Sequence, residues 1–437
     1  MRDLALLAIV LGAIPFIFKR PLYGLLLWVA FSIMNPHRLA YGFAYDFPFA
    51  MILAVATITS VLIHQEKNYP FPVNAVTVFL MLFIVWVCIS PLFSSYPEGE
   101  LWPWMRVIKI QIMVLITFYV VGRRSELDFL AWALALSIGF FGLKGGLFTL
   151  RGGGGEKVFG PEGSFISDNN TLALAIIMAV PIFRYLQLQS SNRWVKRGCI
   201  LMMLLCVASS VGSQSRGALL ALAGMGVFLW FKSPNKGALG AVALLLGIVI
   251  FSTMPDSWTN RMNSIGSYSQ DQSSMGRINA WWMAWNLAVN RFPIGGGFEI
   301  YNEGTFARFA PDPQDIHAAH SIYFQVLGEH GFIGLFLFLS VFVAAWRCGS
   351  WVISQTKNRH ELRWAQDLAA MLQVSLVGYA VGGAFLSLSY YDFPYYVVVM
   401  LVITRIVVDQ EIKAVLKVAS TAHGRASGAA GVFGLER

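Results

Sequence analysis

Charged residues are scarce in this sequence of 437 residues, since only 13% of them are Asp, Glu, Lys or Arg. In soluble domains, roughly a quarter of the residues are charged. Apolar residues make up 57% of the chain and fall in blocks long enough to cross a bilayer as helices. The net charge of +9 comes mostly from short connectors, so it does not indicate nucleic-acid binding. The composition excludes a soluble globular protein and predicts a polytopic membrane protein.

Motifs that hold metals, nucleotides or disulfides are absent as well. The four cysteines form no CxxC pair and lie in or beside apolar runs, so we expect packing residues rather than disulfides or metal ligands. There is no HExxH motif and no P-loop, and the closely spaced acidic pair Asp312 and Asp315 is not a DxD motif. We therefore expect no metal and no cofactor, and any chemistry must use a substrate that is already activated.

Apolar runs recur along the whole chain. The first two are shorter than the roughly 17 residues that a membrane helix needs, so a shallow or broken hairpin is an alternative to two spans there. The N-terminus has no small-x-small cleavage site, so we expect it to be retained. We predict an all-α membrane protein with twelve, alternatively thirteen, transmembrane helices. The runs cover residues 4–18, 21–34, 47–63, 73–93, 107–122, 128–148, 170–187, 199–212, 215–231, 237–254, 321–346, 366–388 and 392–409.

Lys and Arg in the connectors predict the orientation. They gather in alternate connectors, and the positive-inside rule places these in the cytoplasm together with the C-terminus. The remaining connectors then face the periplasm across a bacterial inner membrane, while the orientation of the N-terminus stays open. The basic connectors lie around residues 123–124, 184–197, 232–236, 347–363 and 413–417. The outward-facing ones are 35–46, 94–106, 149–169, 213–214, 255–320 and 389–391.

Residues 255–320 are the one long polar stretch of the chain. The stretch contains no lysine, so its cations are arginines, which bind phosphate in a fixed geometry. Within it, residues 273–288 predict a helix at the membrane surface, with Trp281 and Trp285 on one face. We divide the chain into N-terminal membrane helices, a periplasmic loop that holds the active site, C-terminal membrane helices and a disordered cytoplasmic tail. These parts are residues 1–254, 255–320, 321–410 and 411–437.

One histidine and two arginines are the candidate catalytic residues. His320 opens an apolar helix, whose positive end favours a neutral imidazole able to accept a proton; a loop histidine without a role is the alternative. Arg216 and Arg277 lie at predicted helix starts, where N–H groups and guanidinium bind phosphate together. For Arg216, the alternative is an arginine that only reaches the lipid headgroups. We also expect the substrates to contact Arg151, Asn170, Arg291 and Tyr323.

Three motifs occur in a fixed order over residues 160–340. They are Ser215-Arg216-Gly217-Ala218, then Gly276-Arg277 with Pro293-Ile-Gly-Gly-Gly297, and finally His320-Ser-Ile-Tyr323 with Glu329-His-Gly331-Phe-Ile-Gly334. Together they resemble the O-antigen ligase family, part of the Wzy_C-type superfamily of O-antigen ligases, polymerases and protein O-oligosaccharyltransferases. One departure is Ser321, where the family commonly has asparagine.

The resemblance implies a GT-C-like glycosyltransferase of lipopolysaccharide biosynthesis, with His320, Arg216 and Arg277 as the essential residues. Its donor would be a polysaccharide on undecaprenyl diphosphate, and its acceptor a sugar hydroxyl of lipid A–core oligosaccharide. The transfer would invert the anomeric centre and need neither metal nor ATP. An O-antigen polymerase, a protein O-oligosaccharyltransferase and a transporter of lipid-linked glycans are the alternatives. The glycan and the oligomeric state stay open.

Overall fold

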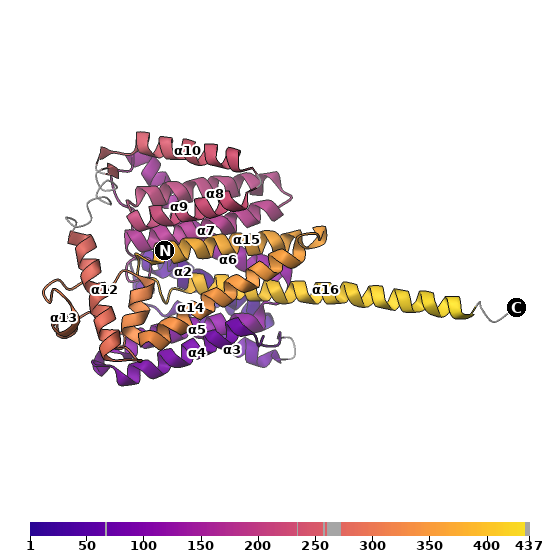
Figure 1. Cartoon of the computed structure of the whole chain (residues 1–437), viewed down its shortest axis with the longest axis horizontal. Coiled ribbons are helices and arrows are strands. Elements are labelled where there is room, and N and C mark those ends of the chain that lie inside the picture. Colours follow the sequence, from indigo (N-terminus) through magenta and orange to yellow (C-terminus); the bar gives the residue numbers. More distant parts are fainter. Residues whose placement is uncertain (66–67, 234, 257, 260–271, 433–437) are drawn as a thin grey trace.

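The computed structural model describes residues 1–65, 68–233, 235–256, 258–259 and 272–432, and all regular elements in these ranges are helices (Figure 1). Each predicted apolar run corresponds to one helix, with differences at the ends. The helices are α1 (Arg2–Lys19), α2 (Pro21–Met34), α3 (Phe49–Ile63), α4 (Ala75–Ile89), α5 (Leu101–Val120), α6 (Arg124–Gly152), α7 (Asn169–Gln189), α8 (Arg193–Gly212), α9 (Arg216–Lys232), α10 (Lys236–Thr253), α12 (Gln272–Asn290), α13 (Glu303–Phe309), α14 (Ile322–Thr356), α15 (Arg363–Gly383) and α16 (Asp392–Val432).

Within the described ranges, 6 helices are long and apolar enough to cross a membrane. They are α4 with the short helix that follows it, α5, α6, α7, α8 and α14. Two more, α2 and α3, are apolar but shorter, and α9 has 17 residues. The chain is therefore an all-helical protein of the membrane type, and the count of twelve or thirteen spans stays a prediction.

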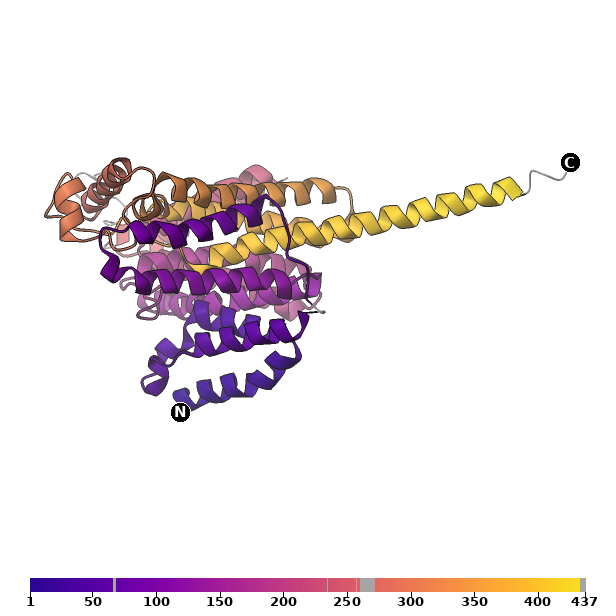
Figure 2. The same ribbon diagram turned by 90° about the horizontal axis from the view of Figure 1, so that it is seen from below.

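The helices run antiparallel between two ends of a bundle (Figures 1 and 2). We call one the loop end, since it holds the connectors at 35–48, 90–100, 153–168, 213–215, 291–321 and 384–391; the other is the connector end. At the loop end, Arg2 donates to the Leu39 carbonyl at 3.0 Å. At the connector end, Arg20 pairs with Glu126 at 2.5 Å. Helix α1 thus runs from one end of the bundle to the other, while a shallow hairpin and two spans both stay open as predictions.

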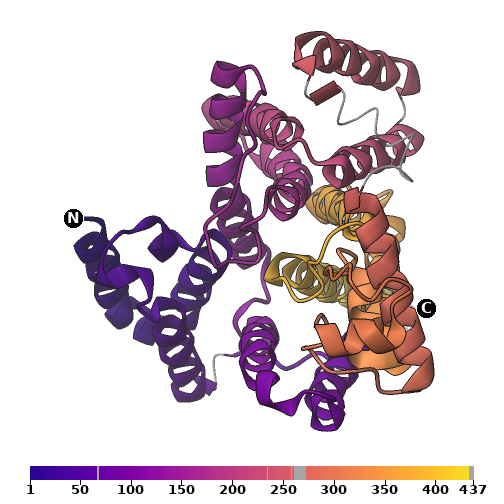
Figure 3. The same cartoon turned by 90° about the vertical axis from the view of Figure 1, so that its left-hand side faces the viewer.

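The first half of α16 lies at the centre of the bundle (Figure 3). Its residues Tyr395 to Ile403 are all buried. The second half leaves the bundle and continues as helix to Val432 (Figure 1). The sequence predicted a disordered tail over residues 411–437, whereas the structure describes helix to Val432; the alanines of this segment, among them Ala426, Ala429 and Ala430, favour helix.

Gly331 interrupts α14 beside a glycine-rich turn. It has a φ of 69°, and a Cβ at this position would lie 2.0 Å from the carbonyl oxygen of Pro293. The break frees two carbonyl groups of α14, which accept the N–H groups of Gly296 and Gly297 at 2.9 Å each. The turn that follows α12 is thereby docked into α14.

Replacing Gly331 by alanine is expected to lower the Tm in detergent by about 5 °C. The methyl group would collide with Pro293, and the left-handed backbone adds about 1–2 kcal/mol for a residue with a Cβ. Gly226→Ala is the control, because a Cβ at Gly226 meets nothing within 4 Å and alanine favours helix. Thermal unfolding measures both; an equal Tm for the two variants would contradict the docked turn.

Helix α12 lies across the loop end (Figure 1). Trp281 and Trp285 share one face, as predicted. Trp281 stacks on Phe324 with ring centroids 5.1 Å apart, and Trp285 meets Phe332 edge-on at 5.6 Å. This face therefore packs against α14, while the Trp285 side chain stays 43% exposed, and the place of the two rings in the membrane interface stays a prediction.

Candidate active site

His320 is held in an unusual backbone conformation where the polar stretch meets α14. Its φ is 44°, a region that residues with a Cβ rarely adopt. The residue before it is fixed by α12, since the Trp281 indole N–H donates to the Ala319 carbonyl at 2.6 Å. Ser321, the residue after it, is the N-cap of α14. The half-buried imidazole is thus placed at a helix start, as the sequence predicted.

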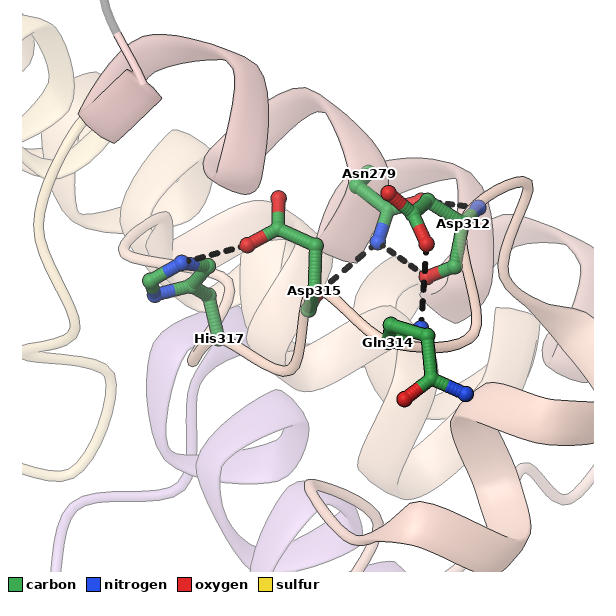
Figure 4. Close-up of polar contacts among 5 residues, drawn as sticks. All are labelled: Asn279, Asp312, Gln314, Asp315 and His317. Atoms are coloured by element: carbon green, nitrogen blue, oxygen red, sulfur yellow. Dashed lines mark hydrogen bonds and ion pairs between the residues drawn. The ribbon is translucent and has the colours of Figure 1, made fainter.

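The segment that leads to His320 is anchored on α12 by one asparagine (Figure 4). The Asn279 side-chain amide donates to the carbonyl groups of Asp312 and Asp315 at 2.8 and 2.9 Å. The same side chain accepts the Asp312 N–H at 2.9 Å. His317 contacts the Asp315 carboxylate at 2.8 Å, and its ring lies against Gly276, where a Cβ would be 2.3 Å away. The acidic pair therefore has a structural role, and Gly276 lets the segment approach α12.

Electrostatics favour a neutral ring at His320. Burial lowers its pKa from the usual 6.5, and the positive charge of Arg277 lowers it further, while the carboxylate of Asp168 acts in the opposite direction. Arg277 comes from α12 and Asp168 from the residue before α7, so distant parts of the chain meet at His320. A neutral imidazole at physiological pH is able to accept a proton.

Arg216 emerges from a tight turn at the loop end. Gln214 has a φ of 57°, and its amide donates to the Gly154 carbonyl at 3.1 Å, which ties the turn to the glycine-rich segment. The Ser215 hydroxyl accepts the Ala218 N–H at 3.2 Å and caps α9. Arg216 is therefore the first residue of a capped helix, the arrangement that binds anions.

Two contacts bring the Arg216 turn to His320 and Arg277. The Asn169 amide, next to Asp168, donates to the Ser213 carbonyl at 2.7 Å. Phe385 lies between the two arginine-bearing helices: its Cβ is 3.3 Å from a Cβ built at Gly217, and its ring is 6.4 Å from Trp281. The three candidate catalytic residues thus gather in one region of the loop end.

Of the four predicted substrate contacts, Asn170 lies beside this region, because its amide donates to Asp168 at 3.0 Å. Arg151 is exposed at the end of α6. Arg291 follows α12 about 21 Å along the helix axis from Arg277, and it donates to Ser95 and to the Phe93 carbonyl.

The Tyr323 hydroxyl donates to the Ala380 carbonyl at 2.8 Å and ties α14 to α15. Tyr323 and Arg291 therefore both make structural contacts, and only Arg291 lies at the far end of α12 from Arg277. Substrate binding by all four residues stays a prediction.

Buried carboxylates support the site, and the sequence did not point to them. Glu100 accepts the N–H groups of Phe298 and Glu299 at 2.9 and 3.1 Å, which holds the chain after the glycine-rich turn. Glu329 accepts the Tyr390 hydroxyl and, at 3.2 Å, the Gln325 amide. Glu329 belongs to the last of the three sequence motifs. The sequence did not indicate, however, that it binds Tyr390 of the α15–α16 connector. Among the described residues, no three His, Cys, Asp or Glu side chains cluster as metal ligands would.

Comparison with known families gives two matches along the chain. Residues 201–339 match the family described as O-antigen ligase, and this range includes Arg216, Arg277 and His320. Residues 1–191 match a family of unknown function. No curated protein matches the chain.

Proposed function

Since the chain belongs to an O-antigen ligase-type family through residues 201–339, we propose that it is a glycosyltransferase that acts as an O-antigen ligase. In this proposal, it transfers a polysaccharide from undecaprenyl diphosphate to a sugar hydroxyl of lipid A–core oligosaccharide. The loop end faces the periplasm from the inner membrane, the C-terminus is cytoplasmic and the fold is GT-C-like. The observation that carries the proposal is the half-buried His320, with a lowered pKa, beside Arg277 and the Arg216 helix start.

The reaction exchanges one bond to the anomeric carbon for another. The acceptor hydroxyl attacks C1, its proton passes to the neutral ring of His320, and the bond from C1 to the diphosphate oxygen breaks. Negative charge grows on the departing diphosphate, where Arg216 and Arg277 stabilise it. Attack opposite the leaving group inverts the anomeric centre. The sugar–diphosphate bond supplies the free energy, so ATP is not required.

Transfer in vitro tests the proposal. Purified protein is mixed with an undecaprenyl-diphosphate glycan and lipid A–core, with EDTA and without nucleotide. A glycan-bearing lipid A product supports the ligase. Growth of the lipid-linked glycan instead assigns the protein as a polymerase. Absence of product from folded protein that binds the donor lipid favours a transporter.

Exchanging Asp168 for asparagine is expected to move the acid limb of the pH–rate profile to lower pH. The negative charge of Asp168 raises the pKa of His320, so its removal lets the ring stay neutral at lower pH. Asparagine caps helices as well as aspartate does, which preserves the cap of α7, where Asp168 accepts the Asn170 N–H at 2.8 Å.

The profile is measured as kcat/KM between about pH 5 and 8, the range in which histidine titrates. Glu162→Gln is the matched control, an exposed acid of the same loop, and its acid limb should stay in place. A limb that moves to higher pH in Asp168→Asn, or does not move, would refute the contact between this carboxylate and the base.

A further inference from the structure

One cavity lies outside the region of His320. It has a volume of about 470 Å³ and lies between α2, α3 and α5. Its walls along these helices are largely apolar, and include Trp28, Phe31, Met51, Ala54, Ile58 and Met113. At the loop end it is bordered by His37 and Arg38 from the connector after α2, and by Phe165 from the connector before α7. We call this cavity the α3–α5 cleft.

Three cations line the α3–α5 cleft. Arg38 comes from the connector, and Arg106 and Lys109 lie one turn apart on α5. The Arg106 guanidinium carbon lies 3.6 Å from the centroid of the Phe165 ring. Burial lowers the pKa of His37 to about 4, and the charge of Arg38 lowers it too, so His37 is neutral and adds a polar group without charge.

The acidic groups near the cleft do not reach Lys109. Asp46 is mostly exposed and pairs with Arg38 at 3.2 Å. Asp392 accepts the hydroxyl hydrogen of Ser32, a cleft residue. Within the described part of the chain, the exposed Lys109 ammonium has neither a hydrogen bond nor an ion pair, although α5 is a candidate span.

A cation inside a membrane span is costly unless it reaches the headgroups or pairs with an anion. An anionic group is therefore the fitting partner for Lys109. Apolar walls with cations near one end match the shape of a lipid that carries phosphate on its headgroup.

The position of the cleft distinguishes the two lipid substrates of the proposed reaction, which are the diphosphate-linked donor and the acceptor glycolipid. The proposed function assigns the donor diphosphate to Arg216 and Arg277. The α3–α5 cleft is separated from them by one loop, whose Phe165 borders the cleft and whose Asp168, three residues on, acts on His320. A lipid headgroup at the loop end of the cleft would therefore lie against the same loop that carries Asp168 to His320, as an acceptor sugar must.

We propose that the α3–α5 cleft binds the acceptor glycolipid through a phosphate of its headgroup, with Arg106 and Lys109 as the phosphate ligands and the apolar walls around its acyl chains. The choice of the acceptor over other phosphate-bearing lipids rests on the proposed function. Binding itself does not require that transfer occurs.

The test compares Lys109→Gln with wild type in two assays. In the transfer assay, the KM for lipid A–core is expected to rise about tenfold, the size of one lost charge-assisted hydrogen bond, while the donor KM and kcat stay within about twofold. The binding assay uses native mass spectrometry. Wild type is expected to retain more phosphorylated lipid A than dephosphorylated lipid A, and this preference should be smaller in Lys109→Gln. Lys109→Arg should restore both.

Lys144→Gln is the matched control, because Lys144 is an exposed lysine within the candidate span α6. Equal behaviour of Lys109→Gln and Lys144→Gln overturns the proposal. A raised donor KM in Lys109→Gln would assign the cleft to the donor and would also overturn the proposal. Displacement of lipid A by equimolar phosphatidylglycerol would overturn it as well. If wild type transfers no glycan, the proposed function fails, but a phosphate-dependent preference that Lys109→Gln reduces still supports the cleft.

Discussion

Replacing His320 by alanine is expected to lower kcat for glycan transfer about 10³-fold, within the range that loss of a general base produces. The half-buried ring, neutral because burial and Arg277 lower its pKa, accepts the proton of the acceptor hydroxyl in our mechanism. Without it, the proton must pass to water during attack. The donor KM should change little, because the ring acts on the acceptor. Steady-state transfer from the lipid-linked donor to lipid A–core measures both constants.

The backbone at His320 calls for a second variant. Because its φ is 44°, alanine introduces strain as well as removing the base. Asparagine tolerates this conformation and lacks a basic nitrogen, so His320→Asn should lose as much activity as His320→Ala. Activity retained in the asparagine variant would assign the loss to backbone strain. An acid limb near neutral pH that survives in both variants would contradict the role of the base.

The sequence predicted the helices well because most apolar runs are long and end at polar, charged or glycine-rich connectors. It also placed His320, Arg216 and Arg277 at helix starts, which the structure confirms for Arg216, the first residue of α9, whereas His320 lies one residue before the N-cap Ser321 of α14. For Arg277, helix α12 begins at Gln272, so this residue lies in the second turn rather than the first.

The sequence patterns did not predict contacts between residues that lie far apart in the chain. Glu100 binds the backbone of Phe298, 198 residues further along the chain, and Glu329 binds Tyr390 from another connector. Periodicity reports which face of a helix is apolar, but it carries no information about which distant segment covers that face. The same limit explains Trp281, since nothing in the sequence indicated that its ring stacks on Phe324 of α14.

Arg291 illustrates the limit of reasoning from residue type. It is an arginine of the polar stretch, like Arg277, and on residue type alone both were expected to contact the substrates. The structure places it at the other end of α12, where it holds the end of the connector after α4. Residue type alone therefore did not predict which arginines gather at His320.

Replacing Arg277 by glutamine is expected to lower kcat about 10²–10³-fold, with a smaller rise in the donor KM. Charge on the diphosphate increases as the bond to C1 breaks, so a guanidinium stabilises the transition state more than the bound donor. Arg277→Lys should recover only part of the rate, because an ammonium lacks the planar bidentate contact. Arg308→Gln is the control, an exposed arginine of the same stretch, and should transfer at the wild-type rate.

A double variant decides whether Arg216 and Arg277 act on the same diphosphate. If both stabilise one leaving group, the loss in Arg216→Gln/Arg277→Gln should be smaller than the product of the two single losses, because groups that act as a unit are not additive. Single-turnover transfer from bound donor, which excludes product release, is the measurement. Losses that multiply would mean that the arginines act independently, and the capped start of α9 would then be a separate anion site. Coupled losses would mean that the first turn of α9 and helix α12 stabilise the same diphosphate, with His320 on the side of the acceptor.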